Sequence, residues 1–159
     1  MFTGALAVSY YGVPRTTMDV DLVVKVTRRE ARTRLVSALR SAGLQVDERS
    51  IDEAFESGFR IATFRDSVSP FSVDIILSSR RFEKRAGSLL GLPTFYPTPE
   101  DLILAKLRMI KATVPRERAL KDEDDVRGVL RFTEVDVKRL RRRAQKDSTL
   151  SILEEITLT

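Results

Sequence analysis

Two carboxylates stand two residues apart in the segment Asp19-Val20-Asp21. Successive side chains of a strand alternate between its two faces, so Asp19 and Asp21 are expected on one face and Val20 and Leu22 in the core. Carboxylate oxygens are the ligands that hard divalent cations prefer, and such a cation can also bind nucleotide phosphates. The triplet therefore predicts a metal site.

A third acid, Asp74, lies inside the apolar, β-branched run from Phe71 to Leu77. A buried carboxylate is costly unless it is paired or bound to a cation. If this strand adjoins the first one, Asp74 reaches the same face as Asp19 and Asp21. It would then serve as a metal ligand and as the proton acceptor for an attacking hydroxyl. The alternative is an edge strand whose Asp74 faces water.

Candidate phosphate-binding residues surround these acids in the sequence. Gly4 lets the backbone approach closely and, with Ala5, opens a predicted helix whose N–H groups suit phosphate; ordinary helix initiation is the alternative. Arg15 either clamps phosphate or pairs with Asp19 or Asp21. Lys106 shares a helix side with apolar residues, so it either extends to solvent or faces a charged pocket.

A dense charge run extends from Arg118 to Asp125, and such runs are usually solvated helix faces. Helical periodicity places Asp122 and Asp125 beside the buried stripe and turns Glu123 and Asp124 outward. The basic residues between positions 138 and 146 spread around another helix without interleaved aromatic residues. They are interpreted as solvated helix surface.

The elements that position these residues follow from periodicity and from turn residues. Helices are predicted at 5–11, 28–42, 51–57, 80–86, 99–112, 118–131, 133–146 and 150–156, strands at 19–26, 44–46, 59–64 and 71–77, and a connection at 87–99. Thr98 is the expected N-cap of the helix at 99–112. The pattern predicts an α+β fold, with a mixed β-sheet core at 1–97 flanked by helices and a C-terminal helical region at 98–159.

The composition narrows the chemistry. The 159 residues, 42% of them hydrophobic, include no cysteine and no histidine, which excludes disulfides, thiolate zinc sites and imidazole bases. No apolar run reaches the length of a membrane span and no signal peptide is evident, so a cytoplasmic location without membrane contact is expected. The net charge of +5 favours an anionic partner.

Together, these residues resemble the nucleotidyltransferase superfamily related to DNA polymerase β, and within it the abortive-infection toxin type of bacterial nucleotidyltransferase. The similarity covers residues 3 to 130 and four separated motifs in the same order. The matching residues are Gly4-Ala5, the lead-in Gly12-Val13-Pro14-Arg15-Thr16-Thr17, Asp19-Val20-Asp21-Leu22, Asp74, Lys106, and the later group Arg118, Lys121, Asp122 and Asp125.

The resemblance implies transfer of a nucleoside monophosphate from a nucleoside triphosphate to an acceptor hydroxyl, with Mg2+ or Mn2+. The implied metal ligands are Asp19, Asp21 and Asp74. These three acids with Lys106, Lys121 and Asp122 form the implied catalytic set, and Gly4, Ala5, Arg15, Thr17 and Asp125 contact the nucleotide. Asp122 and Asp125 would orient Lys121 or the acceptor. The implied partners are transfer RNA or another RNA and an antitoxin protein.

Two departures from the family pattern qualify these expectations. Ala5 replaces a glycine or small polar residue, so a hydroxyl contact to phosphate is missing. Only Met1-Phe2-Thr3 precede Gly4, where the family has a helix and a strand. We therefore expect an incomplete sheet edge near residues 1 to 3, exposed or covered by another subunit. A non-catalytic module that senses nucleotide or binds a protein is the alternative, and transfer to a small molecule such as an aminoglycoside is a third option.

Overall fold

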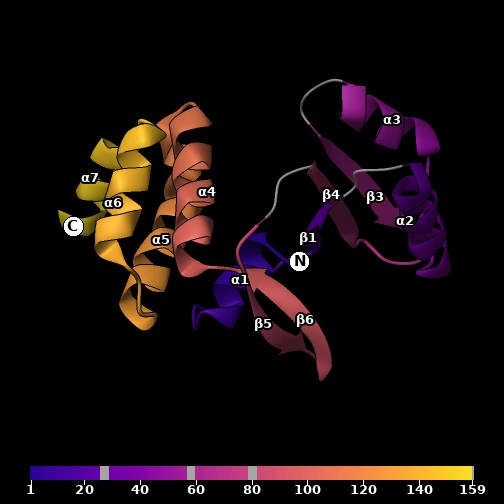
Figure 1. Cartoon of the computed structure of the whole chain (residues 1–159), viewed down its shortest axis with the longest axis horizontal. Coiled ribbons are helices and arrows are strands. Elements are labelled where there is room, and N and C mark those ends of the chain that lie inside the picture. The colour runs from indigo at the N-terminus through magenta and orange to yellow at the C-terminus, as the bar shows by residue number, and fades with distance from the viewer. Residues whose placement is uncertain (26–28, 57–59, 79–81, 159) are drawn as a thin grey trace.

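The computed structural model describes residues 1–25, 29–56, 60–78 and 82–158 (Figure 1). The predicted α+β class is confirmed. The helices are α1 (Gly4–Tyr10), α2 (Arg29–Ser41), α3 (Glu48–Glu56), α4 (Pro99–Ala112), α5 (Leu120–Phe132), α6 (Val137–Lys146) and α7 (Leu150–Leu158), with a 3-10 helix at Arg116–Ala119. The strands are β1 (Asp19–Lys25), β2 (Leu44–Gln45), β3 (Ile61–Asp66), β4 (Ser72–Ser78), β5 (Lys84–Leu89) and β6 (Leu92–Pro97).

Strands β1 to β4 form a mixed sheet in the order β1-β4-β3-β2. Strand β4 runs parallel to β1 and antiparallel to β3, so the predicted hairpin of β3 and β4 is confirmed and the first strand joins it through β4. Helices α2 and α3 cover one face, where apolar side chains of β1, β3 and β4 enter a core around Ile51, Phe64 and Ile75. The alternation of side chains then places the acids of β1 and β4 on the opposite face.

A second core joins the C-terminal helices to two elements from the first part of the chain. Ala7 and Val8 of α1 and Tyr96 of β6 pack with buried residues of α4 to α7, among them Leu104 and Leu140. Figure 1 shows α4 to α7 as a bundle on one side of α1, with the mixed sheet on the other. The division of the chain at residues 97 and 98 stays a prediction.

The helix predicted at 80–86 and the connection predicted at 87–99 are both wrong within the described residues. Strands β5 and β6 form an antiparallel hairpin there, with Leu89 opposite Leu92. The two turn residues, Leu90 and Gly91, have φ of 50° and 81°, the positive values that a tight hairpin turn requires. Tyr96 anchors the hairpin because its ring stacks on Tyr10 with a centroid distance of 4.0 Å.

The open sheet edge expected near residues 1 to 3 is covered by those residues themselves. Phe2 bridges Leu22 of β1 in an antiparallel arrangement, and the Thr3 N–H donates to the Asp21 carbonyl at 2.9 Å. The Phe2 N–H donates to the Phe95 carbonyl at 2.9 Å, which ties the hairpin to the same segment. An oligomer formed through this edge stays a prediction.

The C-terminal helices follow the sequence pattern closely. The Thr98 side chain accepts a hydrogen bond from the Asp101 N–H at 3.2 Å, so it caps α4 as expected. Helix α6 begins four residues later than predicted because Asp136 caps it by accepting from the Arg139 N–H. Within the described ranges, no helix has the length and apolar character needed to cross a membrane.

Candidate active site

The parallel pairing of β1 and β4 brings the three predicted acids to one face of the sheet. Asp21 lies directly opposite Asp74, and Asp19 lies opposite Ser72. Asp19 and Asp74 each accept a hydrogen bond from a hydroxyl on a neighbouring strand. The Ser72 hydroxyl donates to Asp19 Oδ1, and the Thr63 hydroxyl donates to Asp74 Oδ1 at 2.6 Å. The strand register thus groups the carboxylates, while hydroxyls on the same face orient two of them.

The half-buried Asp21 carboxyl is the one most affected by its neighbours. Burial raises the pKa of Asp21 above its ordinary value, and the negative charge of Asp74 raises it further. Lys106 acts in the opposite direction, and Asp19 adds a weaker repulsion. The Asp21 carboxyl therefore interacts with charged groups on β1, β4 and α4.

Gly4, the first residue of α1, packs directly against the Asp21 carboxylate. Its φ is +56°, and a Cβ placed on it would stand 1.9 Å from Asp21 Oδ2. A residue with a side chain is disfavoured here twice, by the left-handed backbone and by the collision. The glycine at this position thus permits close approach of the backbone to an acid, whereas its predicted contact with phosphate stays a prediction. Ala5 follows it as the second, half-buried residue of the helix.

Gly4→Ala is expected to lower the free energy of unfolding by more than the roughly 1–2 kcal/mol that a left-handed backbone costs an L-residue. The additional loss comes from moving the Asp21 carboxylate away from the new methyl group. Gly43→Ala is the matched control, because Gly43 has φ +81° and nothing within 4 Å of its added Cβ. Urea denaturation of both variants measures the difference, and equal losses would contradict the close contact.

Lys106 is the centre of an ion-pair network between α4 and α5. Its Nζ contacts Asp122 Oδ1 at 2.7 Å and Asp125 Oδ2 at 2.8 Å. Burial alone would lower the pKa of Lys106, but hydrogen bonds and charge from Asp122 and Asp125 raise it above its ordinary value. The amine is therefore a fixed ammonium group whose charge also reaches Asp21. Of the two alternatives for Lys106, the charged pocket is the one observed.

Arg15 and Thr17 lie in the segment that leads into β1. Arg15 Nη1 contacts Asp125 Oδ1 at 3.1 Å. Its ion-pair partner is therefore Asp125 and not Asp19 or Asp21, the two partners that the sequence predicted. Asp125, with a side chain only 1% exposed, thus joins this segment to α4 through Lys106. The Thr17 hydroxyl donates to the Asp19 carbonyl at 3.0 Å and accepts from its N–H at 3.1 Å, which fixes the start of β1.

Two expectations for α5 need correction. Asp122 and Asp125 bind Lys106, and Lys121 is exposed on the helix surface, so of the two expected roles only orientation of the acceptor stays a prediction. Glu123 was expected to face outward with Asp124, but only Asp124 is exposed. Glu123 is buried because Arg116 covers it, with its Nε 2.6 Å from Glu123 Oε1. The 3-10 helix that carries Arg116 was not distinguished from α5 in the sequence pattern.

The donor set suits a hard divalent cation in its chemistry. All three acids offer oxygen ligands, and a cation would offset the burial and the repulsion by Asp74 that raise the pKa of Asp21. Within the described part of the chain, no three acidic side chains already lie in an arrangement that encloses a metal ion. The hydroxyls of Ser72 and Thr63 therefore compete with a cation for Asp19 and Asp74.

The sequence interpretation missed Ser72 and Thr63 as parts of this site. Ser72 has a signal in the sequence, because it stands two residues before Asp74 and therefore shares its strand face. Thr63 has none, because its place opposite Asp74 depends on the register of β3 against β4. No family model matches this chain, and a search of curated proteins finds no similar protein.

Proposed function

We propose that this protein is a nucleotidyltransferase that moves a nucleoside monophosphate from a nucleoside triphosphate to an acceptor hydroxyl. The observation that carries the proposal is the pairing of Asp21 with Asp74 across parallel strands, with Gly4 against Asp21 and Lys106 nearby. Acids on a sheet, a helix start held against one of them and a fixed ammonium group together match what nucleotidyl transfer requires.

Asp19 and Asp21, with Asp74, would hold Mg2+ or Mn2+. When bound, such a cation neutralises phosphate charge and helps to align the triphosphate. Gly4 has no side chain, so the start of α1 lies against Asp21, and the backbone N–H groups of Gly4 and Ala5 would contact phosphate oxygens. Lys106 supplies positive charge for the triphosphate, and Asp122 and Asp125 keep it ionised and in place.

Asp74 is the candidate proton acceptor. The acceptor hydroxyl oxygen forms a bond to the α-phosphorus, its proton passes to Asp74, and the bond from the α-phosphorus to the bridging oxygen breaks so that pyrophosphate leaves. Thr63 keeps one Asp74 oxygen oriented by donating its hydroxyl proton, and the second oxygen can accept the proton. The net charge of +5 favours an RNA acceptor. The family resemblance adds the setting of a toxin that is paired with an antitoxin.

The test is incubation of the protein with each of four α-labelled nucleoside triphosphates, total RNA and Mg2+ or Mn2+. Label is expected to move to RNA with at least one nucleotide, and Asp74→Asn is expected to abolish the transfer. If nucleotide binds but no label moves to any acceptor with either cation, the proposal fails and the nucleotide-sensing alternative takes its place.

A further inference from the structure

A cavity of about 410 Å3 lies on the same sheet face as the three acids. Its wall includes Val23 of β1 and Ile76 of β4, which pair with one another as Asp21 and Asp74 do. Two residues along a strand advance roughly 7 Å, so the cavity begins about that far from the Asp21–Asp74 pair. Thr3, which donates its N–H to the Asp21 carbonyl, also lines it.

Three arginines form one rim of this cavity, which we call the arginine-rimmed cavity. Arg139 and Arg143 lie four residues apart on one face of α6, and Arg108 comes from α4. The sequence pattern suggested that the basic residues of α6 are solvated helix surface. Arg139 and Arg143 instead line this cavity. Glu83 and Asp101 in the same wall, together with Asp147, balance the charge of the three arginines, so the rim offers guanidinium N–H donors rather than a net positive charge.

Each arginine keeps hydrogen-bonding capacity for a ligand. Arg139 binds Glu83, Arg143 binds Asp101, and Arg108 binds Asp147. A guanidinium has five N–H donors, and one carboxylate does not use them all. The arginine side chains are also 31% to 55% exposed. They can therefore accept an additional anion without losing their existing partners.

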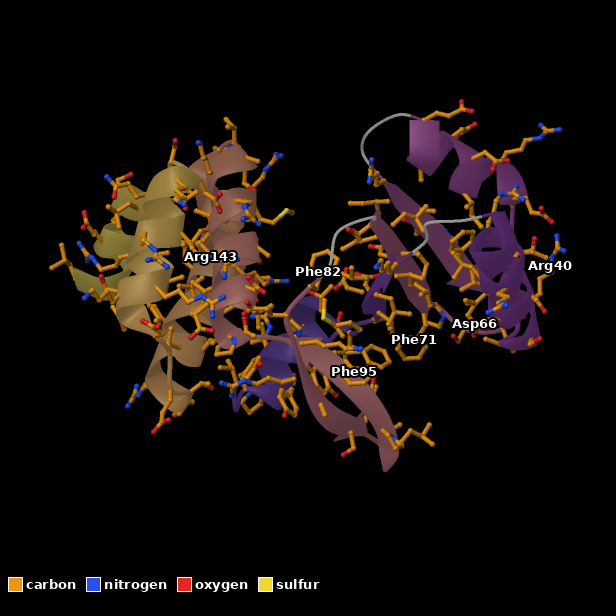
Figure 2. The ribbon with its side chains drawn as sticks, in the orientation of Figure 1. Arg40, Asp66, Phe71, Phe82, Phe95 and Arg143 are labelled. Atoms are coloured by element: carbon orange, nitrogen blue, oxygen red, sulfur yellow. The ribbon has the colours of Figure 1, made fainter. Side chains whose placement is uncertain are left out.

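The other wall is apolar and carries an exposed aromatic ring. Phe82 is 38% exposed and lies between α4 and the sheet, beside Ala105 and Pro97 in the cavity wall (Figure 2). Figure 2 also places Arg143 on the helical side of the same region. An aromatic ring beside arginines is the combination with which proteins stack a base and bind its phosphate.

We propose that the arginine-rimmed cavity binds the terminal nucleotide of a polynucleotide acceptor, with the base on Phe82 and the phosphodiester at the arginines. The inference rests on the proposed function and names its acceptor subsite. The donor triphosphate would use Lys106 and the cation that the acids would hold, so the guanidinium donors of the arginine rim are left for a second anion. A terminal nucleotide held there directs its free hydroxyl toward Asp74.

The test measures binding without transfer. A short 5′-labelled oligoribonucleotide with a free 3′ hydroxyl is titrated by fluorescence anisotropy in EDTA, with the full chain and its variants. Phe82→Ala is expected to weaken binding about tenfold through loss of stacking. Arg108→Gln is expected to weaken binding and to reduce the salt dependence by about one phosphate contact. Melting temperatures confirm that both variants fold.

Controls and outcomes separate this inference from the proposed function. Leu90→Ala at the hairpin tip and Arg40→Gln on α2 remove comparable exposed groups elsewhere and are expected to bind like the parent chain. Unchanged oligonucleotide binding in both Phe82→Ala and Arg108→Gln would overturn the inference. Variants that bind ATP more weakly but the oligonucleotide as well as the parent chain would also overturn it. Cavity-dependent oligonucleotide binding without any label transfer would instead count against the proposed function and leave the inference standing.

Discussion

Asp21→Asn is expected to lower nucleotidyl transfer roughly a thousandfold while the folded chain stays at least as stable as the parent. The loss follows because a metal-binding carboxylate contributes several kcal/mol to transition-state stabilisation, and each 1.36 kcal/mol is a factor of ten in rate. Stability is retained because Asp21 is half-buried beside two other acids, which makes its charge unfavourable. Transfer rates and thermal melting at pH 7 measure the two effects.

The stability advantage expected of Asp21→Asn depends on pH in a definite direction. The pKa of Asp21 in the folded chain lies above its ordinary value of 3.8, so the folded state holds the proton more tightly than the unfolded state. Its contribution to stability is therefore unfavourable above the folded-state pKa and disappears as the pH falls below about 3.8. Asp21→Asn removes this contribution, and its advantage in melting temperature should shrink between pH 7 and pH 4.

Asp124→Asn is the matched control, since Asp124 is 71% exposed and pairs with Arg127 on the surface of α5. Exposed pairs contribute about 0–1 kcal/mol, so this variant should change neither transfer nor stability by much. An Asp21→Asn variant that transfers label at the parent rate would remove Asp21 from the proposed site. A variant that melts far below the parent at pH 7 would contradict the account of its charge.

Lys106→Met is expected to cost about 3 kcal/mol of the free energy of unfolding, the low end of what breaking a buried ion pair costs. The loss arises because Asp125, 1% exposed, keeps Arg15 as its one cationic partner among the described residues, and Asp122 loses its contact with Lys106. Transfer activity should be lost as well, because no ammonium remains beside the acids. Urea denaturation and the label-transfer assay check these outcomes.

Two comparisons make the result interpretable. Lys121→Met removes an exposed lysine from the same ion-rich region and is expected to change stability by less than about 0.5 kcal/mol, as surface substitutions do. Lys106→Met combined with Asp125→Asn should recover part of the loss, because the double variant no longer buries an undercompensated carboxylate. A double variant that only sums the two single losses would show that Lys106 and Asp125 are not coupled.

The sheet acids were predictable because strand alternation is a strict rule. Asp19 and Asp21 had to share a face, and Asp74 inside a β-branched run had to belong to a neighbouring strand or an edge. The sequence did not contain the register that sets Asp21 opposite Asp74 rather than one pair further along. That register depends on packing of Leu22, Val24 and the β4 side chains against α2 and α3.

The hairpin and the network around Lys106 show where local patterns fail. Proline at positions 93 and 97 made β6 look like a connection, although proline is compatible with an edge strand. Periodicity correctly placed Asp122 and Asp125 beside a buried stripe, but the family resemblance gave Lys121 or the acceptor as the group that they orient. Their actual partner comes from α4, and contacts between helices depend on packing angles that a one-dimensional pattern does not contain.

The presence of two separate hydrophobic cores has a consequence for how the site works. β1 gives Leu22 to the core under α2 and α3, whereas α1, which begins at Gly4, belongs to the core of the C-terminal helices. The candidate site is therefore a junction between the two halves of the chain that contain these cores. A substrate that bridges the junction would hold the halves together, so substrate capture and alignment of the charged groups become one event.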